Sequence, residues 1–136
     1  MNFISNFNWR PTLSGIALSL LLATGCAQRH NTLSEQEIAD GWELLFDGKT
    51  LDAWKDYNGD SLTMPWRAVD GCIQAHGDGS DLSGYIVTRK QYENFILDWD
   101  WKLSYGGNSG MLYHVVEDPY FKVPYVTGPE YQLIDE

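Results

Sequence analysis

The sequence contains few cysteines and few basic residues, and it has no long apolar run. Two cysteines among 136 residues give neither a dense disulfide framework nor the Cys/His spacing of a zinc site. Nine Lys and Arg stand against 19 Asp and Glu, so the net charge is −10, and such a surface repels the phosphates of nucleic acid. The apolar stretch at residues 16–23 is too short to span a bilayer.

The residues that are present indicate one folded domain. Hydrophobic residues make up 43% of the chain and aromatic residues 14%, which is more apolar surface than a disordered chain carries. A chain of 136 residues can build one modest core. We therefore expect a single domain, without nucleic acid as a partner.

Residues 1–25 have the pattern of an export signal. Arg10 supplies the positive end, the short apolar stretch follows, and three small residues precede Cys26. A cysteine in this place resembles a bacterial lipobox, which implies that Cys26 carries a lipid; a plain secretory signal or a buried helix is the alternative. We expect an exported protein, lipid-anchored to a bacterial membrane at the periplasm or cell surface, with residues 26–32 as its tether.

A short helix is expected directly after the tether. Ser34 can cap its N-terminus, and Glu37, three residues on, can complete a capping box. Leu33 and Ile38 stand at the spacing of a hydrophobic staple, and Gly41 can end the helix. The helix spans two turns at most.

From Trp42 onward the hydrophobic period is two, which predicts strands. Residues 95–103 alternate apolar and polar side chains, so we expect one buried face. Residues 66–69 and 72–75 flank Asp70-Gly71, a signal for a type I′ hairpin. Further strands are expected at residues 85–88, 111–116 and 131–134. Short strands with glycine-rich turns and one minor helix predict an all-β fold, an antiparallel β-sandwich or barrel.

The last residues, 130–136, read as a strand with no turn and no return partner after it. A sheet that stopped there would have an open edge. We therefore expect residues 33–136 to be the N-terminal part of a longer, incomplete sandwich domain.

Five sequence blocks in a fixed order carry a family resemblance. They are Gly41-Trp42 with Leu45-Phe46-Asp47-Gly48-Lys49-Thr50-Leu51 and Trp54; Trp66-Arg67-Ala68-Val69-Asp70-Gly71; Tyr92-Glu93-Asn94-Phe95 leading to Trp101-Lys102; Gly106-Gly107-Asn108-Ser109-Gly110-Met111-Leu112-Tyr113; and Gly128-Pro129-Glu130-Tyr131-Gln132-Leu133-Ile134-Asp135. Together they resemble the bacterial 3-keto-disaccharide hydrolase family. The resemblance implies a concanavalin A-like lectin/glucanase sandwich, or jelly roll, and a hydrolase of carbohydrate catabolism that acts on 3-keto-glycosides.

Such a reaction needs a base and a group that polarises the sugar ketone, because the ketone at C3 acidifies the C2 proton. Glu130 and Gln132 share a strand face, and His114 lies on the expected neighbouring strand. We predict that these three side chains converge on one sugar, with His114 and Glu130 catalytic and Gln132 binding substrate. A histidine paired with a neighbour and a glutamate capping a turn are the structural alternatives.

Three further residues are candidate substrate contacts. Tyr113 and Trp66 are, with Tyr85, the aromatic residues that we would test for stacking on a sugar. Asn108 stands in a glycine-rich segment, residues 106–110, which reads more simply as a turn with positive φ.

Two acidic segments resemble the sites of other protein classes. Asp98 and Asp100 have the spacing of a retaining glucanase pair, but the third acid is missing, so a solvated strand face is the better interpretation. Residues 56–60 resemble the start of a calcium loop but lack the required Gly and Glu, and read as a surface turn. No cofactor is identified, and a divalent metal held by oxygens of distant loops stays open.

The sequence thus supports three functional hypotheses. The first is an enzyme that cleaves 3-keto-disaccharides or other glycosides, by elimination and then hydration. The second is a carbohydrate-binding module without turnover, and the third is an inactive fragment. In the first two, an oligosaccharide or glycoside is the expected small-molecule partner.

Overall fold

The computed structural model describes residues 2–4, 30–63, 65–75 and 84–135. Their elements, in chain order, are β1 (Asn2–Ile4), α1 (Glu35–Ala39), β2 (Trp54–Asp56), β3 (Trp66–Val69), β4 (Cys72–Ala75), β5 (Ile86–Thr88), β6 (Asp98–Asp100), β7 (Asn108–Leu112), the 3₁₀ helix η1 (Pro124–Val126) and β8 (Glu130–Ile134). Most of the expected export signal, and Cys26 itself, lie outside the described residues.

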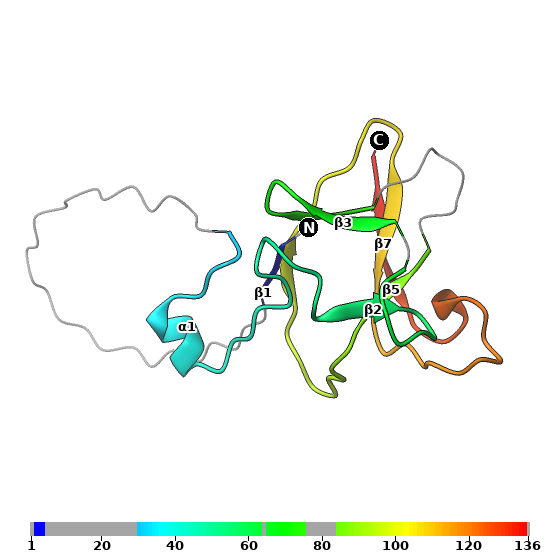
Figure 1. Ribbon diagram of the computed structural model, residues 1–136, viewed down its shortest axis with the longest axis horizontal. Helices are drawn as coiled ribbons and strands as arrows, with labels where there is room; N and C mark the ends of the chain where they lie inside the picture. Colours follow the sequence, from blue (N-terminus) through cyan, green and yellow to red (C-terminus); the bar gives the residue numbers. More distant parts are fainter. Residues whose placement is uncertain (1, 5–29, 64, 76–83, 136) are drawn as a thin grey trace, which may run out of the picture.

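The strands form four antiparallel two-stranded ribbons: β1 with β6, β2 with β5, β3 with β4, and β7 with β8. In Figure 1, β3 and β2 cross the picture at two levels, whereas β7 and β8 run upright and α1 lies apart from the strands. The predicted all-β antiparallel sandwich with one short helix is confirmed. Within the described residues no helix is long and apolar enough to cross a membrane.

The core lies where the four ribbons meet, because each of them contributes side chains to it. Phe46, Trp54 and Ile73 are at most 6% exposed and pack on one another. The partly buried side chains around them are Leu45, Leu51, Trp66, Ala68, Ile86, Leu97, Trp99 and Met111. The Trp54 indole N–H donates to the Leu45 carbonyl oxygen over 2.7 Å, so this large side chain is buried with its polar atom paired. Because Met111 belongs to β7, the core also supports the ribbon that carries the candidate site.

The predicted capping box of α1 is confirmed. The Ser34 backbone N–H donates to the Glu37 carboxylate over 2.6 Å, and the Glu37 N–H donates back to the Ser34 hydroxyl over 3.2 Å. The first of these bonds, with help from the Ser34 side chain, lowers the pKa of Glu37. Gly41 ends the helix with a φ of +86°. Ile38 remains 61% exposed, so the expected hydrophobic staple buries little of it.

The predicted hairpin at Asp70-Gly71 is also confirmed. Val69 pairs with Cys72, and the two residues between them have φ values of +49° and +72°, the left-handed conformation that a type I′ turn requires. The Asn31 side-chain amide donates to the Gly71 carbonyl oxygen over 2.8 Å. The turn is therefore tied to the segment that precedes α1.

The strand expected at residues 95–103 is shorter than its hydrophobic pattern. Among the described residues, only β6 of this segment is paired, and its partner is β1. Leu97 and Trp99 are partly buried as expected, but Phe95 is 40% exposed and Trp101 is 48% exposed. The alternating pattern correctly predicted which side chains of β6 and its neighbour Leu97 face the core. It failed for Phe95 and Trp101, which lie outside the paired residues.

The strand expected at residues 111–116 is displaced towards the N-terminus. β7 begins at Asn108, inside the segment interpreted as a turn, and ends at Leu112. The turn itself is made before the strand, where Gly106 has a φ of +65°. His114 has a φ of +53° and therefore cannot continue the ladder. The expectations that His114 lies in a strand and that Asn108 lies in a turn are both wrong.

The segment at residues 56–60 does more than form a surface turn. Asp56 is 7% exposed and accepts hydrogen bonds from the Thr63 backbone N–H and hydroxyl. The Asn58 side-chain amide donates to the carbonyl oxygens of Asp118 and Phe121, over 3.0 and 2.8 Å. These bonds join the β2 ribbon to the long connection between β7 and β8.

The hairpin turn provides a test of the fold. Replacing Gly71 with Ala places a Cβ on a backbone with a φ of +72°, and we expect this to lower the free energy of unfolding by about 1–2 kcal/mol. Asp70→Asn is the matched control, because Asn tolerates the left-handed conformation, and it should stay within about 0.5 kcal/mol. Urea unfolding measures both values. Equal stability of the two variants would contradict the type I′ turn.

Candidate functional site

The register of β7 and β8 gathers polar side chains on one face of their ribbon. Leu112 pairs with Glu130, Gly110 with Gln132, and Asn108 with Ile134. Because side chains alternate along a strand, these positions point to one face, and Met111 and Leu133 point to the other. Leu133 is 1% exposed, and Met111 packs on the core. The face opposite the core therefore carries Glu130, Gln132 and Asn108, the arrangement expected for Glu130 and Gln132 from the sequence.

Gly110 makes room for the carboxylate of Glu130. A Cβ at Gly110 would lie 2.5 Å from Cδ of Glu130 and 2.7 Å from its Cγ, which is inside van der Waals contact. The Glu130 side chain therefore lies across the strand over the missing side chain of Gly110. The glycine fixes where this carboxylate can lie on the face.

Gln132 and Asn108 form a hydrogen-bonded pair beside this carboxylate. The Gln132 side-chain amide donates to Oδ1 of Asn108 over 2.6 Å and to the carbonyl oxygen of Ser109 over 2.9 Å. Both amide protons of Gln132 are used in this way. Within the described part of the chain, the side-chain oxygen of Gln132 and the side-chain NH₂ group of Asn108 have no hydrogen-bond partner. One acceptor and two donors therefore remain for a polar ligand.

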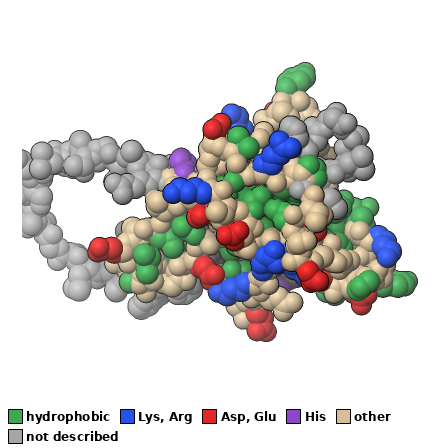
Figure 2. Space-filling view, viewed as in Figure 1, with side chains coloured by type: hydrophobic (Ala, Val, Ile, Leu, Met, Phe, Trp, Pro, Cys, Tyr) green, Lys and Arg blue, Asp and Glu red, His purple; other side chains and the backbone are tan. Residues whose placement is uncertain are grey.

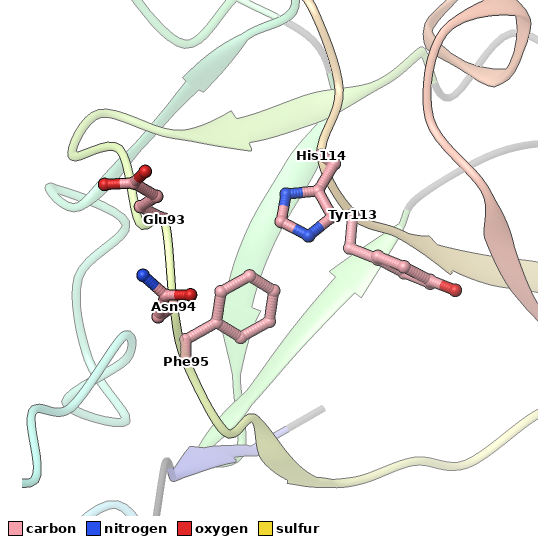
Figure 3. A pocket seen from close by; sticks show the side chains of 5 residues that line it. All are labelled: Glu93, Asn94, Phe95, Tyr113 and His114. Carbon is pink, nitrogen blue, oxygen red and sulfur yellow. The ribbon is translucent and has the colours of Figure 1, made fainter.

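His114 lies just beyond the end of β7, in a hollow of about 390 Å³. Its ring is 5.7 Å, between centroids, from Phe95 and from Tyr113. The remaining lining residues are Glu93 and Asn94 (Figure 3). The hollow is open to solvent, and it combines one carboxylate, one amide and one imidazole with aromatic rings.

The hollow and Glu130 lie at the same end of the ribbon. Glu130 begins β8 opposite Leu112, and the next backbone contact is the Tyr113 N–H, which donates to the Pro129 carbonyl oxygen over 3.1 Å. Trp66 is in a different ribbon, in β3, where it packs against the core. The structure thus groups five of the six predicted contacts at one ribbon and leaves Trp66 apart.

Sequence reasoning missed Gly110 and the segment Glu93 to Phe95. A glycine inside a strand pattern signals close approach of another group, so Gly110 could have been singled out had residues 108–112 been recognised as a strand. Glu93 and Asn94 carry no local signal, because only tertiary structure brings them opposite His114.

Charge and metal-binding groups are dispersed over the described residues. No three His, Cys, Asp or Glu side chains among them gather as a metal site. On the face drawn in Figure 2, acidic and basic side chains alternate and do not form a patch of one sign.

The contact between Gly110 and Glu130 can be tested without a ligand. In Gly110→Ala we expect an unchanged or slightly higher melting temperature, because alanine suits a strand better than glycine and Glu130 can swing into solvent. The ¹³C resonance of the Glu130 carboxylate should shift markedly. Ser109→Ala, on the opposite face, is the control and should leave that resonance in place. An unmoved resonance in Gly110→Ala would contradict the described position of the carboxylate.

Two relatives show what the chain resembles. A 3-keto-disaccharide hydrolase from Bacteroides thetaiotaomicron (strain ATCC 29148) is 34% identical over an alignment of 110 residues, and the match covers 71% of this chain and 38% of the relative. The crystal structure of a candidate glycosyl hydrolase from Parabacteroides distasonis ATCC 8503 matches with a TM-score of 0.68 and 50% identity, over 77% of this chain and 46% of that one.

The match covers only part of the length of each relative. The chain spans less than half of either relative. Over residues 41–136 it also matches the profile of the 3-keto-alpha-glucoside-1,2-lyase-like domain, which is the region where the five blocks, the β7–β8 ribbon and the polar face lie. The chain therefore belongs to the 3-keto-alpha-glucoside-1,2-lyase-like domain family.

Proposed function

We propose that the β7–β8 face of this chain binds and cleaves 3-keto-glycosides, with 3-keto-disaccharides as the substrate class. The observation that carries the proposal is the Glu130 carboxylate held over Gly110 beside the Gln132 and Asn108 pair, in a chain of this family. The family is named after a 1,2-lyase, the Bacteroides relative is a 3-keto-disaccharide hydrolase, and the Parabacteroides relative is a candidate glycosyl hydrolase. One reaction sequence, elimination followed by hydration, accounts for both lyase and hydrolase activity.

The chemistry follows from the ketone. A base removes the proton from C2, which the C3 ketone acidifies, and the electron pair of that C–H bond forms the C1=C2 double bond. The bond between C1 and the leaving oxygen breaks, and this oxygen takes up a proton. Water then adds its hydroxyl to C1 and a proton to C2, so the net reaction is hydrolysis.

The described residues supply groups for each step. Glu130 is the base, because it is the carboxylate on the face and lies in the space that Gly110 leaves open beside the Gln132 and Asn108 pair. The Asn108 amide group, held in place by Gln132, donates to the ketone oxygen as negative charge develops there. His114, beyond the end of β7, protonates the leaving oxygen. Tyr113 remains a proposed sugar contact, whereas Trp66 packs against the core from β3 and takes no part in this site.

Glu130→Gln tests the assignment of the base. The substitution keeps the shape of the side chain and removes its basicity, so we expect turnover of a 3-keto-disaccharide to fall by about 10²–10⁴-fold while substrate binding changes little. Released sugar, measured by chromatography, gives the rate, and titration calorimetry gives the affinity. Glu35→Gln is a control, because that carboxylate is exposed on α1, which lies apart from the strands.

The same assay separates the enzyme from a binding module. Substrate binding by the unmodified chain without any release of sugar would contradict the proposal and favour a carbohydrate-binding module. Retention of full turnover in Glu130→Gln would contradict the role of Glu130 alone. Absence of both binding and turnover would identify the chain as an inactive fragment.

We also propose that the chain is exported and anchored by a lipid on Cys26. The support is the sequence pattern of residues 1–26, a positive charge, an apolar stretch and small residues before the cysteine. In Cys26→Ala, expressed in a bacterial host, we expect the protein to move from the membrane fraction to the soluble fraction. Detergent phase partitioning measures this, with Cys72→Ala as the control. An unchanged distribution would contradict lipidation at Cys26.

A further inference from the structure

The hollow beside His114 has the size and lining of a site for a small ligand. Its volume of about 390 Å³ falls within the range of small-molecule sites. Two segments that are distant in the sequence form it, residues 93–95 before β6 and residues 113–114 after β7. Of these residues, only His114 has a role in the cleavage chemistry described above.

The groups that line the hollow match the chemistry of a pyranose ring. Phe95 is 40% exposed, and an aromatic ring offers a surface to the C–H face of a sugar. Figure 3 shows Glu93 and Asn94 across the hollow from His114, with the Phe95 ring directed towards the imidazole. The Glu93 carboxylate and the Asn94 amide have no hydrogen-bond partner among the described residues, so they remain available to hydroxyl groups.

The backbone of His114 is an independent sign of function. Its φ of +53° is a conformation that residues other than glycine rarely adopt, and such residues collect at functional sites. A glycine or asparagine would satisfy the turn with less strain. The imidazole at this position lies instead over the hollow, between the rings of Phe95 and Tyr113.

The hollow and Glu130 lie at the same end of the β7–β8 ribbon, a few residues apart along the pairing. Leu112 is the pairing partner of Glu130, and His114 follows it by two residues. The Cα atoms of His114 and Glu130 are therefore at most roughly 13 Å apart, from the reach of two residues plus one strand pairing. Two linked sugar rings can bridge such a distance.

We propose that the hollow formed by Glu93, Asn94, Phe95, Tyr113 and His114 binds the second, leaving ring of a disaccharide whose 3-keto ring lies at Glu130. This rests on the proposed function and gives it a substrate preference: a disaccharide over a glycoside with a small leaving group. His114 then stands between the two rings, next to the oxygen that joins them. Phe95 and Asn94 bind the ring, and Glu93 accepts hydrogen bonds from its hydroxyls.

Kinetics with two substrates test the proposal. In Phe95→Ala we expect the KM for a 3-keto-disaccharide to rise about tenfold, the effect of losing one aromatic contact, with kcat little changed. The KM for the 3-keto methyl glycoside, which has no second ring, should stay within about twofold. Glu93→Gln, a change at an exposed side chain, should show the same split without loss of stability. Tyr105→Ala, at a fully exposed aromatic residue, is the control.

The outcomes separate this proposal from the function on which it rests. If the KM of these variants rises equally for both substrates, or rises for neither, the site for the second ring is overturned. The proposal that Glu130 takes part in cleavage is unaffected by that result. Failure of the unmodified chain to cleave either substrate overturns the proposed function instead. In that case, chemical shift changes at residues 93–95 on titration with the non-oxidised disaccharide decide whether the hollow binds a sugar, and their absence contradicts it.

Discussion

The register between β7 and β8 is the constraint on which the candidate site depends. A shift of one residue would turn every side chain of β8 to the opposite face. Leu133, which is 1% exposed, and Met111, which packs on the core, hold the register because they must lie on the buried side. Burial of these two apolar side chains therefore decides that Glu130 and Gln132 face away from the core. The hydrophobic core and the polar face are two consequences of one pairing.

The connection between β7 and β8 fixes where that pairing begins. Its ends are joined by the bond from the Tyr113 N–H to the Pro129 carbonyl oxygen, and inside it the Val116 N–H donates to the Thr127 hydroxyl over 3.1 Å. Gly128 passes so close to this backbone that a Cβ would lie 2.7 Å from the Tyr113 carbonyl oxygen. Close packing between Gly128 and Tyr113, where the two ends of the connection meet, therefore fixes Glu130 as the first residue of β8.

The far side of the same connection is tied to the β2 ribbon. The Asn58 backbone N–H and the Lys55 ammonium both donate to the Glu117 carboxylate, over 3.0 and 2.8 Å. The Tyr57 hydroxyl donates to the Val116 carbonyl oxygen over 2.9 Å. Because β2 contributes Trp54 to the core, these hydrogen bonds fix the position of the loop beyond His114 relative to the core.

Local signals in the sequence predicted local structure well. The capping box at Ser34 and the hairpin at Asp70-Gly71 depend on residues within a few positions of each other, and both were predicted. The shared face of Glu130 and Gln132 followed from the period of two. The family was predicted from ordered motifs, because five separate blocks carry more information than any one pattern.

The features that were not predicted depend on tertiary structure. The apolar run at residues 111–116 continues past the strand, and only the left-handed backbone of His114 ends the ladder. Asn108 was assigned to a turn because glycines surround it, but pairing with Ile134 draws it into β7. The grouping of Glu93 with His114 joins segments that share no local pattern. Contacts across the sheet decided each of these cases.

The central claim is that the β7–β8 face cleaves a 3-keto-glycoside by removing the proton at C2. The most direct measurement is cleavage of a 3-keto-disaccharide in D₂O, followed by NMR of the released keto sugar. The account predicts one deuterium at C2, formed faster than uncatalysed exchange of the substrate, because hydration returns a solvent proton to that carbon. A product that keeps its original C2 hydrogen would show that the bond at C1 breaks by displacement, and would contradict the account.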